Sequence, residues 1–256
     1  MREPGMGEAP ATAAVLVIGD EILSGRTQDS NSNYVARQLA ALGIDLREIR
    51  VVGDVEAEIV AALNALRARH DFVFTTGGIG PTHDDITADA VAKAFGAGIG
   101  YHPEAYAALE ARYPKGEFND ARKRMARVPD GAGLIKNSAS VAPGFQIGNV
   151  FVMAGVPMVM RAMMEEILTR LPRGVPVKSI TVSAELPEGA IAQGLADIQT
   201  EHPETAIGSY PWYHDGRYGT QLVARSRDAA AAEAAAQAIE AMIVQLGGKP
   251  ERVAFV

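Results

Sequence analysis

The sequence contains no cysteine, and this absence excludes disulfide bonds, thiolate metal sites and cysteine nucleophiles. It also lacks an apolar run of the roughly 20 residues that a membrane-spanning helix needs, so we expect no membrane partner. Residues 1–12 contain no apolar segment of the kind that secretory signals carry, and we expect them to form a disordered tail of a cytoplasmic protein. Apolar residues nevertheless make up 48% of the chain, which is enough for a sizeable core.

Positive charge is also scarce, because 24 Lys and Arg residues face 31 Asp and Glu residues and leave a net charge of -7. Such a surface repels polyanions, so nucleic acid is not an expected partner. A small phosphorylated ligand responds to local rather than global charge and is not excluded.

Strands and helices alternate through the first part of the chain. Short connections between them predict right-handed β-α-β units and a mostly parallel sheet, that is, an α/β domain over residues 13–171. The sequence predicts strands at 14–18, 44–52, 71–75 and 150–153, helices that begin near 31, 54, 87 and 157, a broken helical segment over 100–128 and loops over 130–144.

The order of elements changes after the segment 171–176, whose proline and glycine residues are typical of a linker. The pattern that follows is strand, helix, strand, strand, helix, strand, with a hairpin turn at residues 214–217. This order predicts a smaller α+β domain of the ferredoxin-like type over residues 177–256.

The most informative segment is residues 72–87, where an apolar strand ends in glycines that lead to two adjacent carboxylates. Gly77, Gly78 and Gly80 allow the backbone N–H groups to approach a phosphate without obstruction by side chains. Asp84 and Asp85 beside a phosphate would be repulsive unless a divalent cation lay between them. The alternative is a Gly-Pro turn with an aspartate that caps the following helix.

Two further carboxylates, Asp20 and Glu21, follow the first predicted strand. Because ligands bind at the carboxyl ends of parallel strands, we expect these residues to converge with Asp84 and Asp85. Four carboxylates in one crevice would not all stay ionised without a cation. We therefore predict Asp20, Asp84 and Asp85 as ligands of Mg²⁺, Mn²⁺ or Co²⁺; the alternative is that Asp20 and Glu21 cap a loop.

Weaker candidates surround this segment. His83 is either a metal ligand or acid/base group or a hydrogen-bonding support. The segments around Pro143, Gly144 and Gly155 flank a predicted strand and add backbone donors to the crevice. Lys123 and Arg124 are candidates for phosphate neutralisation, although basic residues on a helix are usually solvated. Five methionines at 153–164 predict either an adaptable core or the seam of a homo-oligomer.

Taken in order, these motifs make residues 13–170 resemble the molybdopterin-binding-like domain of competence/damage-inducible protein A (CinA), which belongs with the MoaB and MogA proteins. The loop with His83 and the segment 207–211 are most similar to the short versions related to the domain fused to eukaryotic FAD synthase. The segments that carry the resemblance are Gly19–Gly25, Asp29–Asn31, Val52–Asp54, Gly77–Thr87, Val128–Ala132, Asn137, Ala142–Phe145 and Gly155–Pro157.

The resemblance implies a MogA-like three-layer domain and one of two chemistries. CinA-like domains are associated with metal-dependent hydrolysis of ADP-ribose-type dinucleotides, the FAD synthase version with hydrolysis of FAD, and the MoaB/MogA branch with binding and adenylylation of molybdopterin. It also implies a homo-oligomer. The implied phosphate- and nucleotide-binding residues are Ser24, Asn31, Gly77, Gly78, Gly80, Thr82, Asn137, Pro143, Gly144 and Gly155.

Our leading expectation is a metal-dependent dinucleotide pyrophosphatase whose catalytic residues are Glu21, His83, Asp84 and Asp85, with either Glu21 or His83 as general base. The alternatives are a pterin-binding or adenylyl-transferring protein of molybdenum-cofactor synthesis and a non-enzymatic nucleotide-binding module. The chain departs from the family pattern at three positions, where Ala154, Val159 and Arg124 replace the usual proline, glutamate and lysine.

Overall fold

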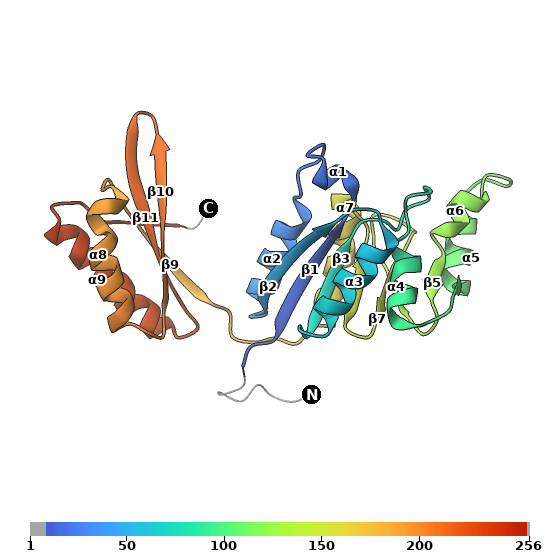
Figure 1. Cartoon of the computed structure of the whole chain (residues 1–256), viewed down its shortest axis with the longest axis horizontal. Coiled ribbons are helices and arrows are strands. Elements are labelled where there is room, and N and C mark those ends of the chain that lie inside the picture. Colours follow the sequence, from blue (N-terminus) through green and yellow to red (C-terminus); the bar gives the residue numbers. More distant parts are fainter. Residues whose placement is uncertain (1–8, 255–256) are drawn as a thin grey trace. The chain divides into compact units, whose positions relative to one another are not determined.

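The computed structural model describes residues 9–254 and divides the chain into two compact units, the first ending at Gly174 and the second beginning at Val175 (Figure 1). Of the expected tail at 1–12, residues 1–8 lie outside the described part. Thr12 does not belong to a tail, because it is the first residue of strand β1 and its backbone N–H donates to Asp71. No helix in residues 9–254 is long and apolar enough to cross a bilayer.

The first unit is built on a six-stranded sheet in which the strand order is β2-β1-β3-β8-β7-β6. The four strands from β2 to β8 run parallel, and β7 and β6 are antiparallel additions at one edge. The strands are β1 (Thr12–Ile18), β2 (Asp45–Val52), β3 (Phe72–Thr76), β6 (Gly133–Ile135), β7 (Gly144–Ile147) and β8 (Val150–Met153).

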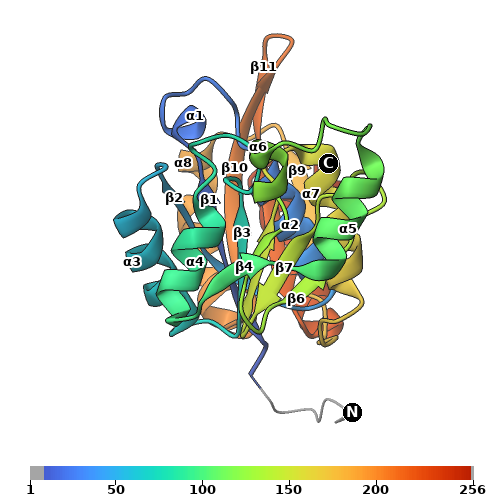
Figure 2. The same cartoon turned by 90° about the vertical axis from the view of Figure 1, so that its right-hand side faces the viewer.

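Helices cover both faces of this sheet, with α3 (Glu56–Arg67) and α4 (Thr87–Phe95) on one side and α2 (Asn31–Ala41) and α7 (Pro157–Leu168) on the other (Figure 2). The unbroken apolar run of β1 serves both layers, because alternate side chains point to opposite faces. Val15 packs with α2 and α7, whereas Leu16 packs with α3 and α4.

Four of the five methionines at 153–164 belong to the core, and a homo-oligomer seam on α7 stays a prediction. Met153, Met160, Met163 and Met164 are buried against the sheet, and Met158 is exposed. The cluster therefore fills the space between α7 and the sheet, as the adaptable-core interpretation predicts.

An excursion follows α4, over residues 99–129, and confirms the predicted broken helical segment: α5 (Pro103–Arg112) and α6 (Asp120–Arg124) are separated by residues 113–119. The ends of the predicted range are wrong, because they belong to the antiparallel strands β4 (Ile99–Tyr101) and β5 (Arg127–Pro129). Strands β4 to β7 have three or four residues each, too few for a strand pattern to be visible in the sequence.

The second unit has the predicted β-α-β-β-α-β order and an antiparallel sheet, β10-β11-β9-β12. Its two helices pack on one face of the sheet and form a separate core. The hairpin turns at Asp215, whose φ of 49° is positive, and Gly216. The elements are β9 (Lys178–Ala184), α8 (Glu188–Glu201), β10 (Ala206–His214), β11 (Arg217–Ser226), α9 (Ala229–Gln245) and β12 (Glu251–Val253), and residues 255–256 lie outside the described part.

Candidate functional site

The four parallel strands end at one edge of the first sheet, and a cleft of about 520 Å³ lies there. Asp54 follows β2, Gly19 follows β1, Gly77 follows β3 and Gly155 follows β8, and all four line the cleft. The chain moves from β1 to β2 on one side and returns to β3 on the other, so the cleft lies at a topological switch point, where open parallel sheets bind ligands.

The glycine loop after β3 adopts a conformation that only glycine tolerates. Gly77 has a φ of 104°, and a Cβ atom there would lie 2.1 Å from the carbonyl oxygen of Ile18. Gly78 has a φ of 69°, and its Cβ would lie 2.1 Å from Thr87 Oγ1. Thr87 Oγ1 donates to the Gly77 carbonyl at 2.9 Å and the Thr87 N–H donates to the Gly78 carbonyl at 3.0 Å, which fixes the loop to the first residue of α4.

This geometry leaves backbone donors available at the cleft. Within residues 9–254, the N–H groups of Gly78, Ile79 and Gly80 have no hydrogen-bond acceptor, whereas the Gly77 N–H donates to Met153. Consecutive unpaired N–H groups in a tight loop are a typical binding element for phosphate oxygens.

The charged side chains that line the cleft are all carboxylates: Glu21, Asp54, Asp84 and Asp85, with no lysine or arginine among the described lining residues. Asp85 accepts hydrogen bonds from the Thr82 N–H at 2.8 Å and from the Thr82 hydroxyl, so it closes the loop. The alternative of an aspartate cap is wrong, because the N-cap residue of α4 is Ile86, without a side-chain cap.

Asp54 is the site residue that the sequence reasoning missed. The sequence predicted a helix that begins near residue 54, and the N-cap of this helix, α3, is Val55 rather than Asp54. Asp54 Oδ2 instead accepts from the Asp20 N–H at 3.0 Å, while the Asp54 N–H donates to Asp20 Oδ1 at 3.4 Å. This reciprocal pair joins the loops after β1 and β2, and Asp20, a predicted metal ligand, is not among the residues that line the cleft. One feature of the sequence could have identified Asp54: it follows a strand of the parallel sheet, as Asp20 and Glu21 do.

The carboxylates influence one another electrostatically. Burial raises the pKa of Asp54 against the hydrogen bond from the Asp20 N–H, and the neighbouring carboxylates of Asp20, Glu21 and Asp84 raise this pKa further. A cation in the cleft would relieve this repulsion.

The donor set fits a cation only in combination with a ligand. In the described part of the chain, no three acidic or histidine side chains are grouped closely enough to hold a metal by themselves. Mg²⁺ on a nucleotide usually takes one or two carboxylates and completes its shell with phosphate oxygens and water. The cleft, whose lining includes both carboxylates and unpaired N–H groups, suits that second arrangement.

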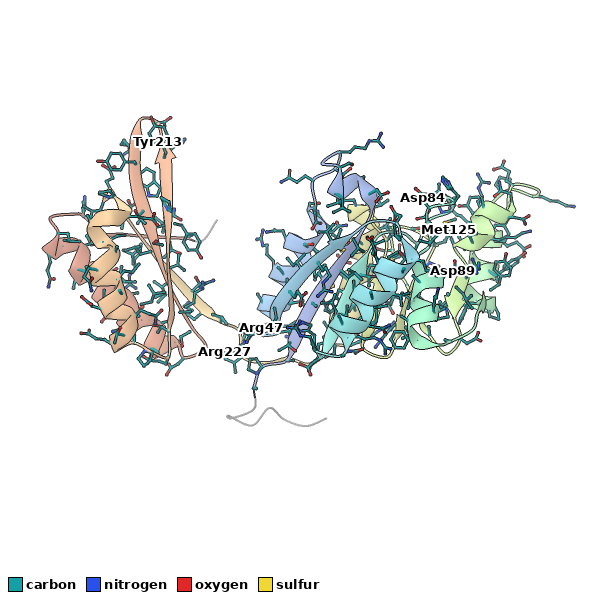
Figure 3. The ribbon with its side chains drawn as sticks, in the orientation of Figure 1. Arg47, Asp84, Asp89, Met125, Tyr213 and Arg227 are labelled. Atoms are coloured by element: carbon teal, nitrogen blue, oxygen red, sulfur yellow. The ribbon has the colours of Figure 1, made fainter. Side chains whose placement is uncertain are left out.

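Several predicted residues lie at the periphery of the cleft. They surround the cleft that Asp84 and Met125 line, both of which Figure 3 labels. His83 lies in the same loop, but 99% of its side chain is exposed and its Nδ1 is 3.9 Å from Asp84 Oδ1. Ser24, at the end of the short helix α1 (Asp20–Leu23), is also exposed.

Others support the cleft without lining it. Asn137 Nδ2 donates to the Ala142 carbonyl at 2.9 Å and closes the loop that carries Ser140 and Ala142 to the cleft. Pro143 is buried beside the glycine loop in a small hollow. Gly144 lies in β7, where a Cβ would approach the Val152 carbonyl to 2.3 Å.

The excursion between β4 and β5 contacts the glycine loop and α4 through two arginines. Arg124 Nη2 donates to the Asp85 carbonyl at 3.2 Å, and Arg127 makes two hydrogen bonds to Asp89 of α4, at 3.0 and 2.6 Å. The two basic candidates for phosphate neutralisation are thus engaged elsewhere: Arg124 with the loop backbone and Lys123 with Asp120 at 2.8 Å.

Each unit is similar to a known family. The family described as "probable molybdopterin binding domain" matches residues 14–173, and the family described as "FAD synthase, middle domain" matches residues 176–247. A protein of Archaeoglobus fulgidus is 34% identical over 197 residues, which cover 77% of this chain and 84% of that protein.

Two comparisons concern CinA. A CinA-like protein of Geobacter sp. is 40% identical over 200 residues, which cover 71% of this chain but 48% of that longer protein. The crystal structure of a CinA protein of unknown function from Thermoplasma acidophilum is similar with a TM-score of 0.60 and 31% identity, over 63% of this chain and 98% of that one. The predicted α/β fold and the resemblance to CinA are thereby confirmed.

Proposed function

The chain belongs to the family of probable molybdopterin-binding domains and is CinA-like, and from this premise we propose that it is a divalent-metal-dependent pyrophosphatase that splits an adenosine dinucleotide into AMP and its other half. The supporting observation is that one cleft combines unpaired N–H groups of the glycine loop with four carboxylates and no cationic side chain among its described lining residues. A diphosphate accepts hydrogen bonds from the N–H groups. A cation between the diphosphate and the carboxylates offsets their mutual repulsion.

Each group of residues then has a role. The N–H groups of Gly78, Ile79 and Gly80 hold the diphosphate. The carboxylates of Asp84 and Asp54 hold the cation. When bound, the cation supplies neutralisation of phosphoryl charge and acidifies a water molecule. Glu21 accepts the proton of the attacking water, since its carboxylate lines the cleft and the His83 side chain is exposed to solvent.

The second unit bears on the choice of substrate. Its match to the family described as FAD synthase, middle domain, leads us to propose FAD as one substrate. The resemblance of the first unit to CinA-like domains implies an ADP-ribose-type dinucleotide as the other. Both ligands contain an AMP group joined through a phosphoanhydride, so the same glycine loop binds the diphosphate of either one.

The test is AMP release from FAD, ADP-ribose, NAD and CoA with Mg²⁺, Mn²⁺ or Co²⁺ and an EDTA control. We expect AMP from FAD or ADP-ribose that disappears with EDTA. Asp84→Asn should lower kcat at least 100-fold, about the loss of one charge-stabilising group. Asp120→Asn, outside the cleft, should leave it unchanged. AMP release that EDTA does not affect, or no release from any compound, would refute the proposal.

The family match supports molybdopterin binding as a second candidate. A titration with molybdopterin distinguishes the two, because tight binding without dinucleotide hydrolysis favours the pterin function. Binding of FAD or ADP-ribose without hydrolysis would instead indicate a non-enzymatic nucleotide-binding module.

A further inference from the structure

The glycine loop is not held equally along its length. Its first part is tied to α4, since Thr87 donates to the carbonyls of Gly77 and Gly78. We call residues 80–85 the outer loop, and within residues 9–254 these residues belong to no apolar cluster. From elsewhere in the described chain the outer loop accepts one side-chain hydrogen bond, which Arg124 Nη2 donates to the Asp85 carbonyl at 3.2 Å. Arg124 is thus the external anchor of this segment.

Asp85 connects this anchor to groups that line the cleft. Its Oδ2 accepts from the Thr82 N–H at 2.8 Å, and a Cβ atom at Gly80 would lie 2.6 Å from the same oxygen. The carboxylate therefore packs on Gly80, whose N–H is one of the three unpaired donors. Asp84, which lines the cleft as a proposed cation ligand, is the preceding residue of the chain. A shift of Asp85 would move a phosphate donor and a cation ligand together.

Arg124 lies behind the outer loop rather than in the cleft. It lines the small hollow described above together with Ile79, Gly80 and Asp85, and these three residues also line the cleft. They therefore form the wall between the two cavities. Arg124 does not line the cleft and Asp84 does not line the hollow, so the loop separates the guanidinium from a ligand in the cleft.

The backbone that carries Arg124 is firmly held. Ala126, two residues farther along, is fully buried, and its carbonyl accepts from the His102 N–H at 2.9 Å. Arg127 ties the same segment to α4 through its two hydrogen bonds to Asp89. A guanidinium that donates to a carbonyl forms a charge-assisted hydrogen bond, which is stronger than a neutral one. Arg124 therefore holds the outer loop against a fixed part of the excursion.

We propose that Arg124 is a positioning residue: through Asp85 it sets the distance between the phosphate-binding N–H groups and the Asp84 carboxylate. The inference rests on the proposed function, because it takes the ligand of the cleft to be a diphosphate with a divalent cation. Both parts of this ligand bind together only if the N–H groups and the carboxylate have the correct separation. Residues that orient a metal ligand without touching the metal commonly have large effects on metal affinity.

The experiment is calorimetric titration of the full chain with the Mn²⁺ complex of methylenediphosphonate, a diphosphate analogue whose P–C–P bridge is not hydrolysed. Arg124→Met should bind this complex roughly tenfold more weakly than wild type, the usual loss when a group that orients a metal ligand is removed. Arg124→Lys keeps a positively charged donor and should stay within about threefold of wild type. This recovery by the conservative variant distinguishes positioning from a merely structural role.

Arg122→Met is the matched control, because Arg122 lies on the same helix, α6, and lines neither cavity. Its contacts stay within the excursion. Arg122 Nη1 donates to Glu117 Oε2 at 3.3 Å, and the guanidinium carbon lies 4.2 Å from the centre of the Tyr113 ring. Arg122→Met should therefore bind the complex as wild type does.

Amide hydrogen exchange provides a readout that needs no ligand. The Asp85 N–H donates to the Thr82 carbonyl within the outer loop, at 3.3 Å. Without the anchor this segment opens more often, so exchange at Asp85 should be roughly tenfold faster in Arg124→Met than in wild type. Exchange at the same amide should be unchanged in Arg122→Met.

Equal affinity of wild type and Arg124→Met for the complex would overturn the inference, as would equal losses in Arg124→Met and Arg122→Met. Unchanged exchange at Asp85 in Arg124→Met would overturn it without reference to any ligand. If wild type does not bind the complex, the proposed function itself fails and the inference fails with it. That result is distinct from the others because it needs no variant.

Discussion

The two units build sheets of different kinds, and the mostly parallel sheet of the first unit gathers loop ends into the cleft described above. Strand β1 is apolar at every position from Ala13 to Ile18, because helices cover both faces of its sheet. Strand β9 alternates instead: Val182 is buried against α8 and α9, and its polar neighbours Thr181 and Ser183 point to the opposite face.

The direction of the strands decides what each unit offers a ligand. Parallel strands bring the loops after β1, β2, β3 and β8 to one edge, where carboxylates and glycines from distant parts of the sequence meet. Antiparallel neighbours such as β10 and β11 are joined directly by a hairpin, so their adjacent ends form one tight turn. Loop convergence, rather than composition, distinguishes the first unit.

The largest predicted effects come from the cores, which share no residue. Phe74→Ala removes a fully buried ring that stacks on Phe151 at 5.2 Å and should cost about 4 kcal/mol. Ile239→Ala in the second core should cost about 3 kcal/mol. Each variant should lower the unfolding midpoint of its own unit alone, in urea titrations followed by circular dichroism and by fluorescence.

Fluorescence separates the units because Trp212, in β10, is the one tryptophan of the chain. Phe74→Ala should leave the tryptophan transition in place while part of the circular dichroism transition moves to lower urea. If both signals move together, the two units unfold as one, and the contrast between them does not extend to stability.

The next effect compares glycines with positive φ in the two units. Gly77→Ala strains the backbone and places Cβ 2.1 Å from the Ile18 carbonyl, which should cost about 3 kcal/mol and abolish ligand binding. Gly216→Ala, with φ of 77° in the hairpin, meets nothing within 4 Å and should cost about 1 kcal/mol. Urea unfolding measures the loss of stability in both variants. Equal losses would show that the backbone around Ile18 moves to make room for the Cβ atom at position 77.

This pair also shows how far the sequence predicts the structure. The glycines of the loop were recognisable because they end an apolar strand, a local pattern with a local cause. The long helices and the order of elements in the second unit were predictable for the same reason, since α9 has 17 residues that are rich in alanine and have high helix propensity.

The missed features depend on contacts between distant residues. The mutual hydrogen bonds of Asp20 and Asp54 join positions 34 residues apart, and no local pattern distinguishes this pair from two helix caps. The hydrogen bond from Asn31 Nδ2 to the Gly155 carbonyl likewise joins positions 124 residues apart. Strands β4 to β7 form because they pair with partners, not because their three or four residues favour it.

The smallest predicted effect tests whether the carboxyl edge of the parallel sheet is electrostatically strained. Because the pKa of Asp54 is raised above 3.8, the folded chain binds this proton more tightly than the unfolded chain, and wild type loses stability as pH rises through the folded pKa. Asp54→Asn removes that loss and keeps an oxygen for the Asp20 N–H. It should be about 0.5 kcal/mol more stable at neutral pH, a modest gain because the site is partly exposed.

Asp71, at the other end of the strands, provides the control of opposite sign. Hydrogen bonds from the Thr12 N–H and hydroxyl, at 2.7 and 2.8 Å, lower its pKa, so its contribution is present at neutral pH and disappears as pH falls through the folded pKa. Melting temperatures measured between pH 4 and pH 8 should therefore show Asp54→Asn above wild type and Asp71→Asn below it at neutral pH. The Asp54→Asn difference should shrink toward pH 4, whereas the Asp71→Asn difference should persist there, because the lowered pKa of Asp71 lies below that range. If Asp54→Asn melts below wild type at neutral pH, the hydrogen bond to Asp20 outweighs the repulsion, and the carboxylates at this edge stabilise the fold without a cation.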